Sequence, residues 1–106
     1  EIALANKKGS GELSLVQKCH LRDVAQDAVR DCTQFCIEKN GAAPEVELHP
    51  RGQLRTFDDL PPIVCMPSHA YYILVELVKN AMQSHINRYT SVCVEDSPPI
   101  QLSIAY

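Results

Sequence analysis

Residues 69–83 constrain the fold more than any other stretch, because apolar and polar side chains separate there onto two sides of one helix. At about 100° of rotation per residue, the polar positions fall within about 40° of Glu76. We call these residues the polar stripe: His69, Tyr72, Glu76, Asn80, Gln83 and Asn87. The other side carries Ile73, Leu74, Leu77, Val78 and Ala81. This pattern predicts a helix that packs on a core through its apolar side.

The polar stripe allows two interpretations, a solvated surface or a functional site. Solvated helix surfaces usually carry Lys and Glu at ion-pair spacing, whereas this stripe is mostly amides and rings. Asn is a poor helix-interior residue, but its carboxamide oxygen is a good ligand for Mg²⁺. Glu76 lies one turn before Asn80 and can act as a general base toward a hydroxyl group or a water. Lys79, at the edge of the stripe, can reach a phosphate or extend into solvent.

The composition excludes several classes of protein. With 106 residues, the chain is one small domain or part of a larger one. A net charge of −3 gives no indication of a nucleic-acid partner, and no apolar run predicts a membrane span. The five cysteines are odd in number and contain no Cys-x-x-Cys pair, which favours a reducing compartment over a disulfide framework. The start at Glu1, without signal-peptide features, predicts a mature or excised piece.

The rest of the sequence predicts a second helix and three strands. Residues 21–39 have an apolar stripe at helical spacing, which includes Phe35, and Asn40-Gly41 ends that helix. Strands are predicted at 45–49, 63–65 and 100–106, with turns or loops at 50–53, 58–62 and 89–99. Ser68 is the predicted N-cap of the helix that carries the polar stripe, which extends to about residue 87 or 88.

Three other groups of residues have both a functional and a plain interpretation. Gly9-Ser10-Gly11 can cradle a phosphate, but no strand precedes it, so a linker is favoured. Cys32 and Cys36 have the spacing of paired metal ligands, but they lie on the apolar stripe, so buried thiols are favoured. Asp58 and Asp59 are favoured as part of a solvated loop over metal ligands.

The predicted elements make an α+β fold in which two helices pack on an incomplete mixed sheet. Three strands are few for two helices, and the last strand leaves an open edge. The chain is therefore predicted to be part of a domain. An exposed edge also favours self-association, so a homodimer is expected.

The segment 68–82, Ser-His-Ala-Tyr-Tyr-Ile-Leu-Val-Glu-Leu-Val-Lys-Asn-Ala-Met, resembles the N-box helix of the mitochondrial 2-oxoacid dehydrogenase kinases. This family comprises the pyruvate dehydrogenase kinases and the branched-chain 2-oxoacid dehydrogenase kinase. The segments 36–44, 65–67 and 98–100 also resemble the family, and residues 2–4 resemble the end of its N-terminal helical domain. The resemblance covers nearly the whole chain.

The resemblance implies a partial histidine-kinase/Hsp90-like ATPase sandwich. Residues 1–11 would be the tail of the preceding helical domain and a linker, and 12–106 the N-terminal half of the ATP-binding domain. ATP and Mg²⁺ would be the cofactors, with Asn80 as the metal ligand and Lys79 and Gln83 near the phosphates. Glu76 would orient or deprotonate a serine hydroxyl of the protein substrate. The implied partners are the E1 component and the lipoyl-bearing E2 component of a 2-oxoacid dehydrogenase complex in the mitochondrial matrix.

The sequence departs from the family in ways that keep other functions open. Gln83 stands where the family usually has Arg, and Tyr72 where the pyruvate dehydrogenase kinases have His. The acidic-x-Gly-x-Gly box and the glycine-rich ATP lid do not occur in these 106 residues, so the chain alone is expected to bind ATP poorly and not to turn over. The alternatives are another ATPase of the same fold, of the histidine kinase or chaperone type, and a non-catalytic interaction fragment.

Overall fold

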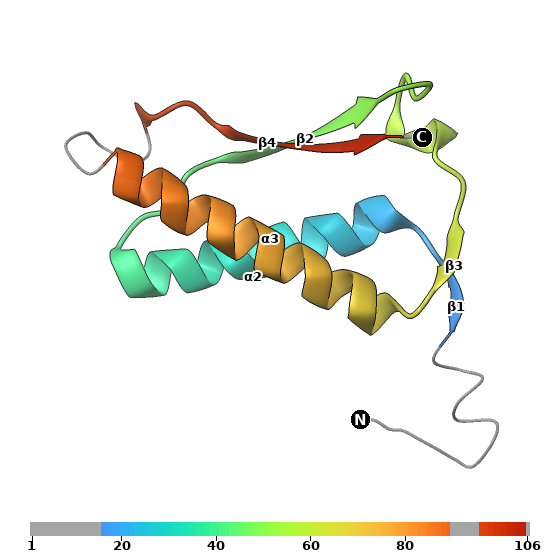
Figure 1. The fold of residues 1–106 in the computed structure, drawn as a ribbon, viewed down its shortest axis with the longest axis horizontal. Helices are drawn as coiled ribbons and strands as arrows, with labels where there is room; N and C mark the ends of the chain where they lie inside the picture. Colours follow the sequence, from blue (N-terminus) through green and yellow to red (C-terminus); the bar gives the residue numbers. More distant parts are fainter. Residues whose placement is uncertain (1–15, 90–95, 106) are drawn as a thin grey trace, which may run out of the picture.

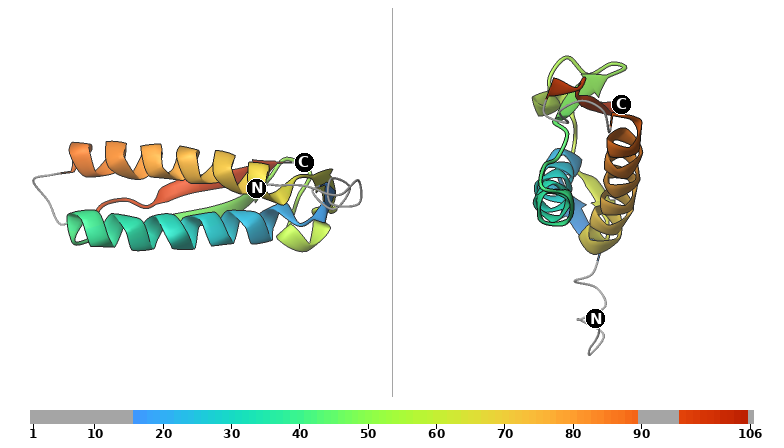
Figure 2. Two further views of the ribbon diagram at one scale, coloured as in Figure 1. Left: turned by 90° about the horizontal axis from the view of Figure 1, so that it is seen from below. Right: turned by 90° about the vertical axis from the view of Figure 1, so that its left-hand side faces the viewer.

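The computed structural model describes residues 16–89 and 96–105. Its elements in chain order are β1 (Gln17–Cys19), α2 (Leu21–Asn40), β2 (Val46–Arg51), the 3-10 helix η1 (Phe57–Asp59), β3 (Ile63–Cys65), α3 (Pro67–Arg88) and β4 (Ile100–Ala105). The two helices run in the same direction in one layer, and β2 and β4 cover one face of that layer (Figures 1 and 2).

The strands form two separate pairs of opposite kinds. β1 is antiparallel to β3, with Cys19 opposite Ile63, and β2 is parallel to β4, with Val46 opposite Ile100. The α+β prediction of two helices on an incomplete mixed sheet is therefore confirmed. The predicted tail and linker at 1–11, and most of the predicted 89–99 loop, lie outside the described residues.

The two helices occur where the apolar periodicity predicts them. α2 ends at Gly41, whose φ of 86° is left-handed and whose N–H donates to the Ile37 carbonyl at 2.8 Å. The predicted N-cap at Ser68 is wrong, because the N-cap of α3 is Met66, two residues earlier, and the helix begins at Pro67. Pro67 takes the first helical position, where its fixed φ and missing N–H cost nothing.

Two turn predictions are corrected by the structure. Residues 50 and 51 belong to β2 and not to a turn. Proline is tolerated there because, among the described strands, β2 pairs only with β4 and so has one free edge. Asp58 and Asp59, at the start of the loop predicted at 58–62, belong to a 3-10 helix in which Thr56 and Asp59 form a capping box. The Asp59 carboxylate thus accepts a local backbone hydrogen bond.

The core consists of two clusters between the helices and the β2–β4 pair. The first contains Ala25, Leu54, Leu60 and Ile104, and the second contains Cys32, Cys36, Val78 and Met82. The prediction that Cys32 and Cys36 are buried thiols is confirmed. Their sulfurs contact the carbonyl oxygens of Val75 and Ala42, at 3.6 and 3.4 Å. Within the described residues, neither helix is long and apolar enough to cross a membrane.

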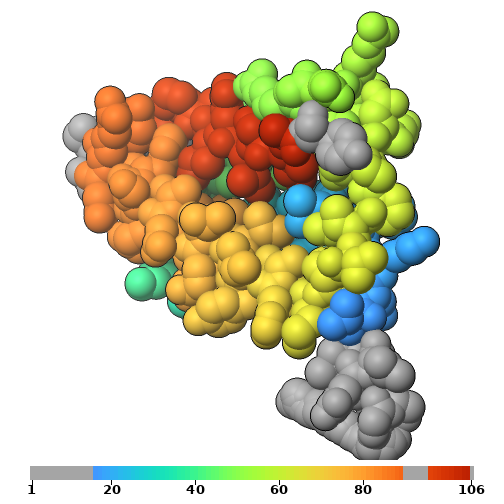
Figure 3. All heavy atoms as spheres, turned by 45° about the vertical axis from the view of Figure 1, so that its right-hand side comes forward, coloured from blue at the N-terminus to red at the C-terminus, as the bar shows by residue number. Residues whose placement is uncertain are grey.

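Three apolar side chains that the helical pattern placed on packed faces are exposed instead. Ile73 and Leu77 are 58% and 57% exposed, and Phe35 on α2 is 51% exposed. The packed direction of α3 passes through Val78 and Met82, so Ile73 and Leu77 lie on its outer flank. α3 forms the middle of the face shown in Figure 3, below β4. The pattern predicted the helix correctly but misjudged which apolar positions are covered.

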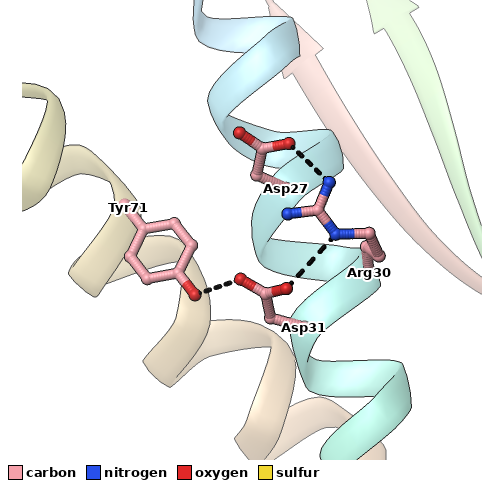
Figure 4. A network of polar contacts seen from close by, with 4 residues as sticks. All are labelled: Asp27, Arg30, Asp31 and Tyr71. Carbon is pink, nitrogen blue, oxygen red and sulfur yellow. Dashed lines mark hydrogen bonds and ion pairs between the residues drawn. The ribbon is translucent and has the colours of Figure 1, made fainter.

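A polar network joins the two helices away from the core (Figure 4). The Tyr71 hydroxyl on α3 donates to the Asp31 carboxylate on α2 at 2.5 Å. Arg30 Nε donates to the other Asp31 oxygen at 3.3 Å, and Arg30 Nη1 reaches Asp27 at 3.1 Å. The hydrogen bond from Tyr71 lowers the pKa of Asp31, and the same bond raises the pKa of Tyr71.

We expect Tyr71→Phe to destabilise the chain more at about pH 7 than at about pH 3. Because the folded-state pKa of Asp31 lies below its ordinary value, this stabilisation is complete above that value and is lost as pH falls through the folded pKa. Urea unfolding of the wild type and of Tyr71→Phe at both pH values measures the difference. An equal difference at the two values would show that the hydrogen bond to the ionised carboxylate contributes nothing.

Candidate functional site

A pocket of about 200 Å³ lies between α2 and α3. Its buried part is formed by Cys32, Cys36 and Met82 of the second core cluster. Its rim is polar and charged, with an exposed ring at one side. The rim residues are Phe35, Lys39 and Asn40 from α2, and Lys79, Asn80 and Gln83 from α3.

The pocket brings together three of the four residues that the sequence singled out. Lys79, Asn80 and Gln83 all line it, whereas Glu76 does not. Glu76 adjoins the pocket through Lys79, whose Nζ donates to the Glu76 carboxylate at 3.4 Å. Both side chains are partly exposed, so this ion pair contributes little to stability and remains free to rearrange.

The two amides of the site differ in their hydrogen bonding. Gln83 Nε2 donates to Asn87 Oδ1 at 3.0 Å, one turn further along α3. The carboxamide of Asn80 has no hydrogen-bond partner among residues 16–89 and 96–105, and it is exposed. Its oxygen is therefore available to a ligand without the loss of an existing bond. His69 and Tyr72, the first residues of the polar stripe, are exposed and lie outside the pocket.

The charge of the rim favours an anionic ligand. Lys39 and Lys79 bring two ammonium groups to the same opening, one from each helix. Lys79 Nζ also lies 5.7 Å from the centre of the Phe35 ring, a cation–π distance. Lys39 has no ion-pair partner in the described part of the chain. Two such cations beside a free carboxamide oxygen suit phosphate groups and the cation that accompanies them.

The residues present are compatible with Mg²⁺ held jointly with phosphates. Over the described ranges, no cluster of three His, Cys, Asp or Glu side chains exists that could hold a metal by itself. Mg²⁺ typically retains several waters and takes only one or two protein oxygens together with substrate phosphates. The Asn80 oxygen fits that coordination. A pocket of about 200 Å³ is also smaller than those that enclose a whole drug-sized ligand, ~300–1,000 Å³, so it can enclose only part of such a ligand.

The sequence does not predict that three α2 residues, Phe35, Lys39 and Asn40, lie on the rim. The apolar stripe predicts Phe35 on the buried side of its helix and Asn40 as part of the helix stop, and Lys39 has no feature that marks it as a site residue. Each has an ordinary position within α2, and only the packing of α2 beside α3 brings them to the opening. The missed strand β1 likewise gave no signal, because Gln17-Lys18-Cys19 lacks the continuous apolar run that identifies the equally short strand at 63–65.

Three curated relatives share most of this chain's length. The mitochondrial [pyruvate dehydrogenase (acetyl-transferring)] kinase of Drosophila melanogaster is 31% identical over 87 residues, which cover 81% of this chain and 21% of that protein. Isozyme 3 of the human kinase is 30% identical over 76 residues, 72% of this chain and 18% of that protein. The kinase of Ascaris suum is 29% identical over 86 residues, 81% of this chain and 21% of that protein.

The chain spans about a fifth of the length of the curated relatives it matches. No family model matches it. All three relatives are named as mitochondrial, in agreement with the predicted location. Over this partial region the chain belongs to the mitochondrial 2-oxoacid dehydrogenase kinase family, as represented by the pyruvate dehydrogenase kinases.

Proposed function

We propose that these residues form part of the ATP-binding domain of a protein serine kinase that acts on the E1 component of a mitochondrial 2-oxoacid dehydrogenase complex. The observation that carries the proposal is the pocket between α2 and α3, where Lys79, Asn80 and Gln83 meet in a chain related to such kinases. The combination of two ammonium groups and a free carboxamide supports phosphate and Mg²⁺ as the bound groups.

Each residue of the site has a role that its position supports. Asn80 would bind Mg²⁺ through its carboxamide oxygen, and Lys79 would neutralise phosphate charge from the neighbouring position on α3. Glu76 would orient the serine hydroxyl and accept its proton, which requires its carboxylate to leave Lys79. Mg-ATP, when bound, supplies the phosphoryl group, and the protein contributes positioning and charge neutralisation.

Gln83 gives this site a lower affinity for phosphate than the Arg of the family pattern would give it. An amide offers two neutral N–H donors, whereas the Arg usual at this position offers a charged fork. The bond from Gln83 to Asn87 also engages one of those donors. We propose that Gln83 contacts the nucleotide only through a neutral hydrogen bond, and that these 106 residues alone bind Mg-ATP poorly and do not turn it over.

The partners and the oligomeric state are further parts of the proposal. The relatives are named as kinases of pyruvate dehydrogenase, which supports the E1 component as substrate. The lipoyl-bearing E2 component as anchor, the mitochondrial matrix as compartment and a homodimer as assembly follow from the family resemblance. The exposed Ile73 and Leu77 favour the alternative of a non-catalytic interaction fragment, since apolar surface on an outer helix flank is typical of a contact.

The decisive experiment is Asn80→Ala in the protein expressed from its own gene, with any sequence that flanks these residues. We expect its Mg-ATP affinity to fall at least ~10-fold. Removal of a group that merely supports a metal ligand already lowers metal affinity by about this factor. Isothermal titration calorimetry with Mg-ATP and a phosphorylation assay on the E1 component measure the effect.

The matched control is Ser84→Ala, an exposed change on the same helix outside the pocket, which should leave both readouts unchanged. Asn80→Asp should keep binding dependent on a divalent cation, because its carboxylate oxygen remains a hard ligand. Wild-type protein that neither binds Mg-ATP nor phosphorylates the E1 component would favour the interaction fragment. Unchanged affinity in Asn80→Ala would remove Asn80 from the site.

A further inference from the structure

Two thiols lie in contact where the first and third strands pair. Cys19 Sγ and Cys65 Sγ are 2.8 Å apart, joined by a hydrogen bond. Cys19 is buried, whereas Cys65 is only half-buried. β1 and β3 lie side by side at one end of the molecule, beyond the start of both helices (Figures 1 and 3).

The strand register explains why these two sulfurs meet. Cys19 is opposite Ile63, and Cys65 is opposite Gln17. Cys65 follows Ile63 by two positions, so its side chain emerges on the same face as that of Cys19. The two cysteines are therefore diagonal neighbours across an antiparallel pair, and the contact between their sulfurs shows that their side chains span this separation.

We propose that Cys19 and Cys65 form a reversible disulfide that clamps β1 to β3 when the protein meets a peroxide. A disulfide joins sulfurs at about 2.05 Å, so the two atoms need to approach by less than about 1 Å from their present contact. The inference does not depend on the proposed kinase function, since it concerns thiols outside the pocket.

The chemistry balances with hydrogen peroxide as the oxidant. The Cys65 thiolate attacks one peroxide oxygen, which forms an S–O bond, breaks the O–O bond and, with one proton, releases water. The Cys19 thiol then attacks the sulfenic sulfur, which forms the S–S bond, while the S–O bond breaks and the departing hydroxide takes the Cys19 proton as water. The two thiols lose two electrons and one peroxide becomes two waters.

The environments of the two thiols assign their order of reaction. The hydrogen bond with Cys65, followed by burial, raises the pKa of Cys19 to about 11. The raised pKa and the burial of Cys19 both disfavour it as the first nucleophile, so the first attack belongs to the more accessible Cys65. A dithiol reductant reverses the clamp by thiol–disulfide exchange.

The position of the clamp gives it a consequence for the neighbouring helix. β3 ends at Cys65, and α3 begins at Pro67 after the single residue Met66. A bond at Cys65 therefore fixes the entry to the helix that carries the polar stripe. It also closes a loop between residues 46 positions apart, which restricts the unfolded chain.

The other described cysteines differ from this pair in ways that make the test specific. Cys32 and Cys36 are buried in the core, and their sulfurs contact backbone carbonyl oxygens. Cys93 lies outside the described residues. Cys93→Ser therefore serves as the control variant, because it removes a thiol without a change to the pair.

The experiment treats the protein with a small excess of hydrogen peroxide, maps its disulfides by mass spectrometry without reduction, and measures thermal unfolding before and after dithiothreitol. We expect a cross-link between the peptides of Cys19 and Cys65, and a rise in Tm of at least about 5 °C that dithiothreitol reverses. Cys93→Ser should keep both effects, and Cys65→Ser and Cys19→Ser should each lose both. Any other dominant cross-link, or no cross-link, overturns the pair. A Cys19–Cys65 disulfide without a rise in Tm overturns the clamp.

Discussion

Glu76→Gln is expected to lower the rate of phosphoryl transfer by about 10²–10⁴-fold while Mg-ATP affinity stays nearly unchanged. Glutamine keeps the shape of the side chain and can still orient a hydroxyl group, but it cannot accept a proton. Because Glu76 lies outside the pocket that Lys79, Asn80 and Gln83 line, binding of the nucleotide should depend on it little. Single-turnover phosphorylation of the E1 component, paired with calorimetric Mg-ATP titration, separates the two effects.

Glu38→Gln is the matched control for this prediction. It makes the same chemical change on α2, where Glu38 is exposed and accepts a hydrogen bond from Gln34 at 3.1 Å. Its rate should equal that of the wild type. An unchanged rate in Glu76→Gln would exclude the general-base role, and a loss of affinity equal to the loss of rate would assign Glu76 to nucleotide binding instead.

Met82→Ala is expected to destabilise the chain by about 2–5 kcal/mol. Met82 is among the most buried side chains and belongs to the cluster that joins α3 to Cys32 and Cys36 of α2. Its truncation loses transfer free energy and leaves a cavity beside the pocket that it lines. Since domains of this size are stable by only ~5–15 kcal/mol, the change should be clear in the midpoint of urea unfolding.

Two companion variants test whether the cost comes from burial. Ser84→Ala, exposed two residues further along α3, should shift stability by no more than about 0.5 kcal/mol. Met82→Leu, which nearly conserves volume, should cost less than about 1.5 kcal/mol. A Met82→Ala variant as stable as Ser84→Ala would mean that the α2–α3 contact does not form a packed core in solution.

The long elements of this fold could be predicted from the sequence because each contains many repeats of its own period. α2 and α3 have 20 and 22 residues, enough for the apolar spacing and the stop at Gly41 to identify them. β1 has three residues and offers no alternation. The extension of β2 through Pro50 depends on which edge of the strand is paired, a property of the sheet and not of the local sequence.

The candidate site was predictable only as far as one helix determines it. Lys79, Asn80 and Gln83 share a side of α3 by helical geometry, and the structure has all three on one pocket. The contribution of Phe35 and Lys39 depends on the parallel packing of α2 beside α3, which no single-helix pattern contains. The exposure of Leu77 has the same origin, because a partner helix decides which part of an apolar side is covered.

The parallel pairing of β2 with β4 has a consequence for the cost of folding. Val46 pairs with Ile100, so the pairing joins residues that are 54 positions apart in the sequence. Closing so long a loop is entropically costly, and contacts between distant residues slow folding. Ile104 then joins Ala25, Leu54 and Leu60 in the first core cluster. Without β4, this cluster would be incomplete and one face of the helix pair would be partly bare.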